Sequence, residues 1–279
     1  MLYLLLAICS SAMVSILMRL SESKIRNNTG MLCMNYLMCI LLGWGYAGAD
    51  WFPGVQGLDR AVTLGCLNGV LYLASFVLLQ INVRKNGVVL SSTFMKLGLL
   101  VTMAVSVCFF GEMPGPVQAA GFFLAVAAIV LINYRSGNRN GAGSAWLLVA
   151  LLVGGGMADA MSKIFEELGN PALADHFLLY TFAVAFLCCV CLNTGGKKGW
   201  PGKWEILFGL SIGIPNFFSS KFLLRALEDI AAVIVYPVYS VAGILLVTMA
   251  GVIFFKERLT KRQWLALGLI LAALVLLNL

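Results

Sequence analysis

Long apolar runs separated by short polar connections dominate this chain. Most of the runs approach the roughly 20 residues that an α-helix needs to cross a bilayer, and none alternates apolar and polar residues as barrel strands do. Backbone polar groups find no partners in hydrocarbon, so helices are the element expected to span it. The pattern predicts ten spans, at residues 2–20, 31–46, 61–82, 87–110, 115–133, 144–165, 174–192, 204–227, 230–255 and 261–279.

The composition agrees with a membrane environment. Hydrophobic residues make up 61% of the chain and charged residues only 11%, whereas a soluble domain carries about 25% charged residues. The connections are too short to form a separate soluble domain. We therefore expect an all-α polytopic membrane protein whose function is carried by the spans and their tight loops.

An internal repeat divides the predicted helices into two sets of five. Residues 91–133 return as residues 236–278 at an offset of 145, which aligns Glu112 with Glu257. At an offset of 144, Gly65 aligns with Gly209, Gly69 with Gly213, and Arg19 with Lys163. We expect two repeats, 1–139 and 140–279, within one integrated membrane domain. An odd number of spans in each copy predicts opposite orientations, an arrangement found in transporters whose substrate site lies near the bilayer midplane.

The net charge of +7 reflects the placement of basic residues in the loops. They gather at odd-numbered connections, as at Arg26, Arg84, Arg135, Lys198 and Lys256, while even-numbered connections are nearly bare. The positive-inside rule predicts that odd-numbered loops are cytoplasmic and that both termini lie outside an integral plasma membrane, here the bacterial cytoplasmic membrane. This placement indicates topology, and we expect no nucleic-acid partner.

Metal and enzymatic chemistry find little support. All eight cysteines fall inside predicted helices, and Cys188, Cys189 and Cys191 point in directions that cannot converge on one ion. The single histidine, His176, has no metal-ligand or nucleophile spacing around it. We expect no metal, no cofactor and no enzymatic activity.

The two turns at residues 109–112 and 254–260 carry a family resemblance. Their Phe-Phe-x-Glu runs, the second continuing as Arg-Leu-Thr, resemble the EamA-type ten-helix transporters of the drug/metabolite transporter superfamily. The resemblance implies a ten-helix transporter but no particular substrate, because the family handles amino acids, nucleotide sugars, sugar phosphates, choline-like cations and drugs. Many relatives carry their basic cluster after the second helix and this chain after the first; either this branch has the opposite orientation, which we favour, or the charge rule misleads.

Lys96 is the most unusual polar position within a predicted span. A lysine deep in a span is costly unless it meets a partner, water or a ligand. Ser92 and Thr93 lie about one turn away on a similar face. We hypothesise that Lys96 offers a positive charge to a carboxylate, a phosphate or another electron-rich group of the substrate. An internal ion pair with Asp159 is an equally weighted alternative, and the two are compatible.

Other polar and aromatic positions are expected to line the same cavity. They concentrate in eight of the ten spans, whereas the fifth and tenth carry almost none and show small residues typical of close helix packing. The lining candidates are Asn35, Asn68, Tyr72, Asn216, Phe217, Tyr236, Tyr239 and Ser240. Each of them alone is more often a helix–helix contact than a ligand contact.

Two charged residues of the sixth span are candidates for coupling. Asp159 is the only carboxylate expected well inside a span, and Lys163 follows it by one turn. The plain alternative is a structural i,i+4 ion pair. For Glu112 and Glu257 we favour a structural role at helix ends over proton coupling.

The sequence therefore predicts a secondary active transporter, an exporter or exchanger of a small polar or amphipathic metabolite. It would work by alternating access at a midplane cavity between inverted repeats, with a proton or a counter-substrate as coupling species. The alternatives are a small-cation or drug efflux transporter and, less favoured, a polytopic membrane enzyme. The expected partners are the substrate and the lipid bilayer, with the protein as a monomer or homodimer.

Overall fold

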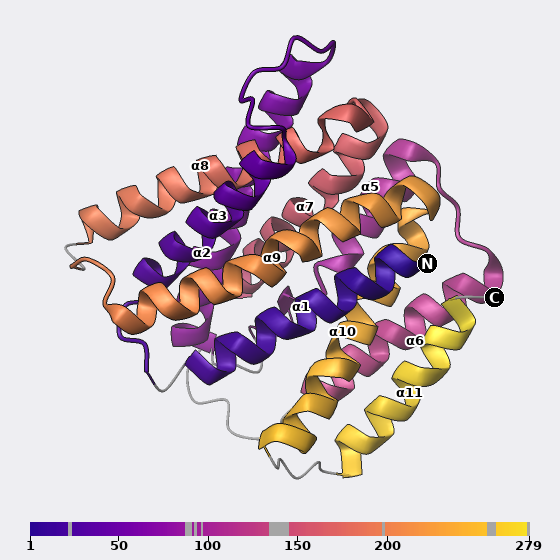
Figure 1. Cartoon of the computed structure of the whole chain (residues 1–279). Coiled ribbons are helices and arrows are strands. Elements are labelled where there is room, and N and C mark those ends of the chain that lie inside the picture. The colour runs from indigo at the N-terminus through magenta and orange to yellow at the C-terminus, as the bar shows by residue number, and fades with distance from the viewer. Residues whose placement is uncertain are drawn as a thin grey trace. The chain divides into compact units, whose positions relative to one another are not determined.

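All regular structure in the described residues is helical. The computed structural model describes residues 1–21, 24–86, 91, 94–95, 97–133, 145–196, 199–255 and 261–277. Within them lie ten α-helices and the short 3-10 helix η1 (Pro171–Leu173). The α-helices, labelled in Figure 1, are α1 (Leu2–Ser21), α2 (Asn28–Tyr46), α3 (Leu58–Asn86), α5 (Leu99–Phe110), α6 (Pro116–Asn133), α7 (Ala145–Leu168), α8 (Ala174–Gly195), α9 (Lys203–Asp229), α10 (Ala232–Phe255) and α11 (Lys261–Leu277). Each overlaps one of the ten predicted runs, so the all-α expectation is confirmed.

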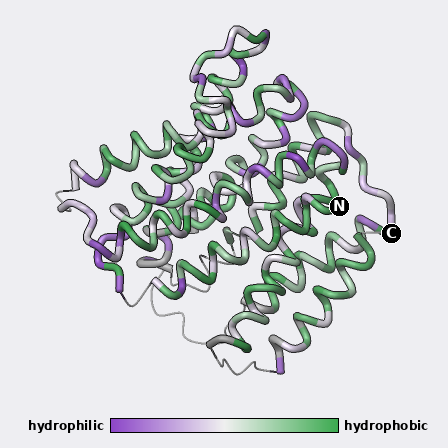
Figure 2. The backbone as a smooth tube through the Cα atoms, viewed as in Figure 1, coloured by the Kyte–Doolittle hydropathy of each residue, from purple (hydrophilic) through white to green (hydrophobic). Residues whose placement is uncertain are grey.

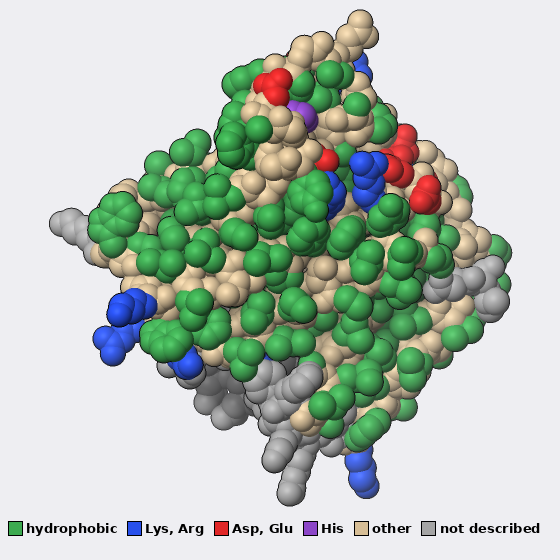
Figure 3. Space-filling model, viewed as in Figure 1, with side chains coloured by type: hydrophobic (Ala, Val, Ile, Leu, Met, Phe, Trp, Pro, Cys, Tyr) green, Lys and Arg blue, Asp and Glu red, His purple; other side chains and the backbone are tan. Residues whose placement is uncertain are grey.

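Length and hydropathy identify a polytopic membrane protein. In the described part of the chain, six helices are long and apolar enough to cross a bilayer: α1, α3, α7, α8 together with η1, α9 and α10. Shorter apolar segments lie in α5, α6 and α11. Figure 2 shows apolar residues along the helices and polar residues gathered mainly at their ends. Hydrophobic side chains also spread over the face seen in Figure 3, as expected of a surface that contacts lipid.

Local sequence determines several helix ends. The Asn27 side chain accepts a hydrogen bond from the Gly30 amide at 3.0 Å and caps α2. Asn170 accepts from the Ala172 amide at the start of η1. Glu112 accepts from the Val233 amide at 3.2 Å, so its carboxylate lies at the positive end of α10. This contact agrees with the structural role expected for Glu112.

The chain divides by packing into two compact units. Unit 1 comprises residues 1–73 and 161–228, and unit 2 comprises residues 74–160 and 229–279. The dividing points fall within α3, within α7 and at the end of α9. Each unit therefore takes helices from both predicted repeats. The repeat boundary at 139/140 stays a prediction.

Four glycines allow close helix crossings in unit 1. A Cβ at Gly65 or Gly69 of α3 would lie within 2.9 Å of atoms of α8, the nearest being the Thr181 carbonyl oxygen, 2.5 Å from Gly69. A Cβ at Gly209 or Gly213 of α9 would lie 2.5 Å from atoms of α2. These are the glycines that the repeat aligns. Only a residue without a side chain permits such backbone contact.

A glycine also lies at a helix contact in unit 2. α6 and α11 lie side by side (Figure 1), and a Cβ at Gly121 would lie 2.9 Å from the Leu276 Cβ. α5 and α10 also pack against each other. Close packing of the fifth and tenth spans, expected from their composition, is confirmed at Gly121.

Candidate functional site

The predicted site residues are distributed over both units, and three lie outside the described residues. Those three are Lys96, Ser92 and Thr93, so the lysine hypothesis stays a prediction. Unit 1 contains five of the cavity-lining candidates, and these provide most of the geometry that follows: Asn35, Asn68, Tyr72, Asn216 and Phe217. Unit 2 contains Tyr236, Tyr239 and Ser240.

A polar cluster lies near the middle of α2 and α9. The Asn216 amide donates to the Asn35 Oδ1 at 3.3 Å, and Asn35 is only 3% exposed. The Cys39 thiol lies beside both residues and donates to the Gly213 carbonyl at 3.3 Å. Asn216 is the central residue of α9. A buried polar group at this depth must be hydrogen-bonded to be tolerated, and here two helices provide the partners.

Tyr72, the central residue of α3, extends this polar region. Its hydroxyl lies 3.4 Å from the Ser220 hydroxyl, one turn beyond Asn216 along α9. Asn68 lies one turn before Tyr72 and is 1% exposed, and its Oδ1 has no hydrogen-bond partner among the described residues. A buried acceptor of this kind is normally satisfied by water or by a ligand. We call Asn35, Cys39, Tyr72, Asn216 and Ser220 the mid-helix cluster.

Aromatic rings surround the mid-helix cluster. The ring centroid of Phe182 in α8 lies 6.3 Å from that of Tyr36, 6.1 Å from that of Tyr72 and 6.2 Å from that of Phe217. Phe217 is fully buried and stacks at 5.7 Å on Tyr46 at the end of α2. The arrangement offers hydrogen-bonding groups beside apolar ring faces, which suits a solute that has both characters.

Among the unit 2 candidates, Tyr236 makes a different contact. The Tyr236 hydroxyl donates to the Asp159 backbone carbonyl at 2.8 Å and joins α10 to α7. Tyr236 is buried, whereas Tyr239 and Ser240 are half-buried and Asp159 is exposed. The structure therefore brings Tyr236 to the residue proposed for coupling, through the backbone of that residue. The coupling role of Asp159 stays a prediction.

Lys163 is buried and held by carboxylates of its own helix. Its Nζ lies 2.5 Å from Glu166 Oε2 and 2.6 Å from Glu167 Oε1. The two carboxylates are the i+3 and i+4 partners of Lys163, a spacing that is visible in the sequence, whereas the predicted partner was Asp159. The pairing with Asp159 stays a prediction.

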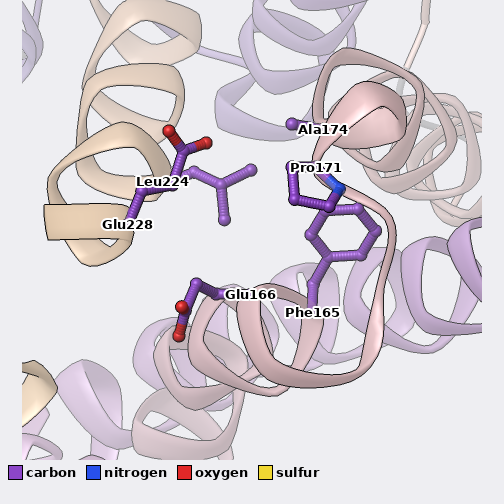
Figure 4. A pocket seen from close by; sticks show the side chains of 6 residues that line it. All are labelled: Phe165, Glu166, Pro171, Ala174, Leu224 and Glu228. Atoms are coloured by element: carbon purple, nitrogen blue, oxygen red, sulfur yellow. The ribbon is translucent and has the colours of Figure 1, made fainter.

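A cavity that the sequence did not suggest lies between α7, η1, α8 and α9. Its volume is about 270 Å³, close to the lower end of ligand pockets. Figure 4 shows its lining by Phe165, Glu166, Pro171, Ala174, Leu224 and Glu228. These residues come from four elements, and no local pattern connects them. Glu166 also binds Lys163, and Glu228 also binds Arg225 at 3.0 Å.

Lys221 is a second feature that sequence reasoning missed. The Lys221 Nζ lies 2.6 Å from Asp175 Oδ1 of α8 and 3.6 Å from the ring centroid of Tyr46 in α2. The lysine thus joins three helices, one turn from Phe217. Its i+4 spacing from Phe217 was the available sequence signal.

No group of three His, Cys, Asp or Glu side chains in the described ranges could hold a metal ion. Two thiols do approach each other: the sulfur of Cys33 lies 3.3 Å from that of Cys189, and both residues are buried. His176 binds the Asp50 carbonyl through Nε2 at 3.1 Å. These contacts connect α2 and the residues that follow it to α8.

Known proteins are similar to this chain in sequence and in fold. An uncharacterized protein of Haemophilus influenzae is 22% identical over 281 residues, which cover 97% of this chain and 95% of that protein. The uncharacterized membrane protein YvaE of Bacillus subtilis is 40% identical over 102 residues, 37% of this chain and 80% of YvaE. A solved crystal structure superposes with a TM-score of 0.78 at 15% identity, covering 99% of this chain and 96% of the other. That likeness concerns the fold.

Two further matches concern transport. A probable 4-amino-4-deoxy-L-arabinose-phosphoundecaprenol flippase subunit ArnE of Hamiltonella defensa is 28% identical over 108 residues, 37% of this chain and 96% of that subunit. The profile of the EamA-like transporter family matches residues 142–279. Together with the helical membrane fold, these similarities establish that the chain belongs to the EamA-like transporter family.

Proposed function

We propose that this protein is a secondary active transporter, an exporter or exchanger, of a small polar or amphipathic metabolite. The hydrogen bond between Asn35 and Asn216 is the observation that carries the proposal. It joins the two predicted repeats near the centre of their helices, inside a shell of aromatic rings. A hydrogen-bonding group at this depth has a cost that binding a polar solute would justify.

The proposal includes an inverted repeat, and the matched glycines support it. Gly65 and Gly69 of α3 contact α8, while Gly209 and Gly213 of α9 contact α2. The repeat aligns α3 with α9 and α2 with α8, so each pair of glycines contacts the helix of the other repeat. Exchanging the two repeats exchanges the two crossings. Any two-fold relation between the repeats has this property, and transporters built from inverted repeats have such an axis within the membrane plane.

Alternating access follows from such symmetry. Two equivalent arrangements of the repeats would open the mid-helix cluster first to one side and then to the other. Pro215 lies inside α9 directly before Asn216 and removes one backbone hydrogen bond there. The helix that supplies Asn216, Phe217 and Ser220 is therefore most easily bent next to the cluster. A proton or a counter-substrate would provide the driving gradient.

The charge distribution of unit 1 supports an orientation. The loop before α2 meets the end of α8 and the start of α9, since the Asn27 side-chain amide donates to Asn193 Oδ1 at 3.0 Å and the Arg26 backbone N–H donates to Glu205 Oε1 at 3.0 Å. Lys24, Arg26 and Lys203 gather there. We propose that this end is cytoplasmic.

Cysteine labelling tests this orientation. In a variant whose native cysteines are replaced, an impermeant maleimide applied to whole cells should label Gly54→Cys, in the loop before α3. It should reach Gly199→Cys only after the cells are permeabilised. The opposite pattern would reverse the proposed orientation.

Transport itself is tested in two steps. A thermal-shift screen of the purified protein against a metabolite library should identify solutes that raise its melting temperature, because ligands stabilise the state they bind. Those solutes should then show saturable counterflow in proteoliposomes, and Asn216→Ala should lose it. Flux that neither saturates nor accelerates with solute on the opposite side would contradict a carrier, and turnover of the solute would indicate an enzyme.

A further inference from the structure

The contacts of Lys221 form a charged site beside the aromatic rings that surround the mid-helix cluster. Its ammonium group lies between the Asp175 carboxylate and the face of the Tyr46 ring. The side chains of Lys221 and Asp175 are 15% and 21% exposed, so the ion pair is largely but not completely removed from solvent. Tyr46 in turn stacks on Phe217, which contacts Phe182 beside Tyr72. A continuous path of aromatic rings therefore leads from the ion pair to the mid-helix cluster.

Two residues that line the 270 Å³ cavity neighbour this ion pair along their helices. Ala174, which lines the cavity, directly precedes Asp175, and Leu224, which also lines it, follows Lys221 by one turn of α9. Positions three apart on a helix share a face, so Lys221 and Leu224 lie on the same side of α9. The ion pair and the cavity therefore lie on the same side of that helix.

Charge balance restricts the solute that could replace this ion pair. A simple anion that bound Lys221 would leave the Asp175 carboxylate partly buried without its partner. A simple cation that bound Asp175 would likewise leave the Lys221 ammonium group partly buried without its partner. An uncompensated charge in a partly buried site is strongly unfavourable. A solute that carries both charges satisfies both residues at once. The Tyr46 face can also accept an ammonium group.

The charges around the cavity agree with this balance. Lys163, Lys221 and Arg225 lie near it together with Glu166, Glu167, Asp175 and Glu228. Each cation among them already lies within 3.0 Å of a carboxylate oxygen. The charges around the cavity are therefore of both signs, and they disfavour neither the carboxylate nor the ammonium group of a zwitterion.

We propose that Lys221 and Asp175 recognise a zwitterionic solute that carries one carboxylate, one ammonium group and an apolar or aromatic group. The carboxylate replaces Asp175 at Lys221, the ammonium group replaces Lys221 at Asp175 and Tyr46, and the apolar part meets the rings of Phe217 and Phe218. This inference rests on the proposed transport function and names its substrate class. The two residues set specificity, and the mid-helix cluster receives the solute next.

Three probes that differ only in charge test the proposal by binding to the purified full-length protein. They are L-phenylalanine, the anion N-acetyl-L-phenylalanine and the cation L-phenylalaninamide. Each analogue loses one charge-assisted hydrogen bond, so the wild-type protein should bind the zwitterion about tenfold more tightly than either. Lys221→Met should make the cation the best ligand, and Asp175→Asn should make the anion the best ligand.

The control is Lys24→Met. Lys24 also lies over an aromatic ring, 4.3 Å from the Trp204 centroid, but at the opposite end of unit 1. This variant should keep the wild-type order of ligands. If Lys221→Met folds poorly, the exchanged pair Lys221→Asp with Asp175→Lys retains opposite charges and should again prefer the zwitterion.

Opposite changes of preference in the two single variants are specific to charge recognition. An ion pair that only clamps α8 to α9 would lower the melting temperature in both variants and leave the order of ligands unchanged, which would overturn the proposal. A wild-type protein that binds the three probes equally, or binds none, would overturn it too. If other solutes still showed counterflow in that case, the proposed transport function would remain supported. Charge-selective binding without any exchange flux would instead contradict transport but support the binding site at Lys221 and Asp175.

Discussion

Gly69 of α3 and Thr181 of α8 lie in backbone contact, because a Cβ at position 69 would come 2.5 Å from the Thr181 carbonyl oxygen. The aligned Gly213 of α9 has the same relation to α2, where a Cβ would lie 2.6 Å from the Asn35 carbonyl oxygen. Two crossings of the same kind thus hold the four helices that surround the mid-helix cluster. Their tightness determines how closely Asn35 and Asn216 approach.

Alanine at either crossing should destabilise the protein. In Gly69→Ala and Gly213→Ala the new methyl group would meet backbone atoms that cannot move aside, and overpacking of this kind costs about 1–3 kcal/mol. Gly45→Ala is the matched control, since it also lies in a helix of unit 1 and its Cβ would meet nothing within 4 Å. Melting temperatures in detergent should fall for the first two variants only. A similar loss in all three would refute the crossing argument.

Removing the Asn216 amide should damage both stability and transport. Asn216→Ala leaves the buried Asn35 Oδ1 without this donor, which costs about 1–3 kcal/mol. Thr194→Ala is the control, because that hydroxyl is exposed and bonds only to carbonyls of its own helix. We expect a lower melting temperature and a loss of counterflow for Asn216→Ala. Normal flux in a destabilised variant would show that the pair is structural.

Glu112 should behave as a helix cap. Its carboxylate accepts from the Val233 amide at 3.2 Å, and loss of a cap costs about 0.5–2 kcal/mol. Glu112→Ala should lower the melting temperature, whereas Glu112→Gln keeps an acceptor oxygen and should recover most of it. The pH dependence of transport should be unchanged in Glu112→Gln. A flattened pH profile in that variant would instead support proton coupling at this carboxylate.

The loop between α2 and α3 should loosen when its bonds to α8 are removed. The Tyr180 hydroxyl donates to the Trp51 carbonyl, and His176 binds the neighbouring Asp50 carbonyl at 3.1 Å. Tyr180→Phe keeps the ring contact with Phe52 and removes only the hydroxyl. Amide hydrogen exchange of residues 47–57 should accelerate in this variant and stay unchanged in Tyr3→Phe. Equal protection in all forms would mean that ring packing alone holds the loop.

The helical architecture could be predicted from sequence because its cause is local. A run of apolar residues identifies a spanning helix by itself, and each of the ten predicted runs overlaps a helix. Most boundaries differ by only a few residues, but of the fourth run, 87–110, α5 covers only Leu99–Phe110. The glycines aligned by the repeat also proved to lie at crossings. Their pattern was visible because a crossing without side chains leaves the same residue type in both copies.

The site was less predictable because its contacts join distant segments. Asn35, Tyr72 and Asn216 were recognised as polar residues in apolar surroundings, and the structure places them near one another. Lys221 was not selected, since its partners Asp175 and Tyr46 come from two other helices. The cavity beside it combines four elements. Sequence identifies which residues are costly to bury, whereas the three-dimensional path of the chain decides which of them meet.

The sulfur atoms of Cys33 and Cys189 lie 3.3 Å apart and are buried between α2 and α8. They can therefore report on the transient separation of these two helices. A polar alkylating reagent can reach them only when those two helices separate, so the modification rate at these two positions measures how often this happens. Read separately from the exposed Cys9, Cys108 and Cys191, it provides a kinetic assay of helix opening in lipid without an engineered label.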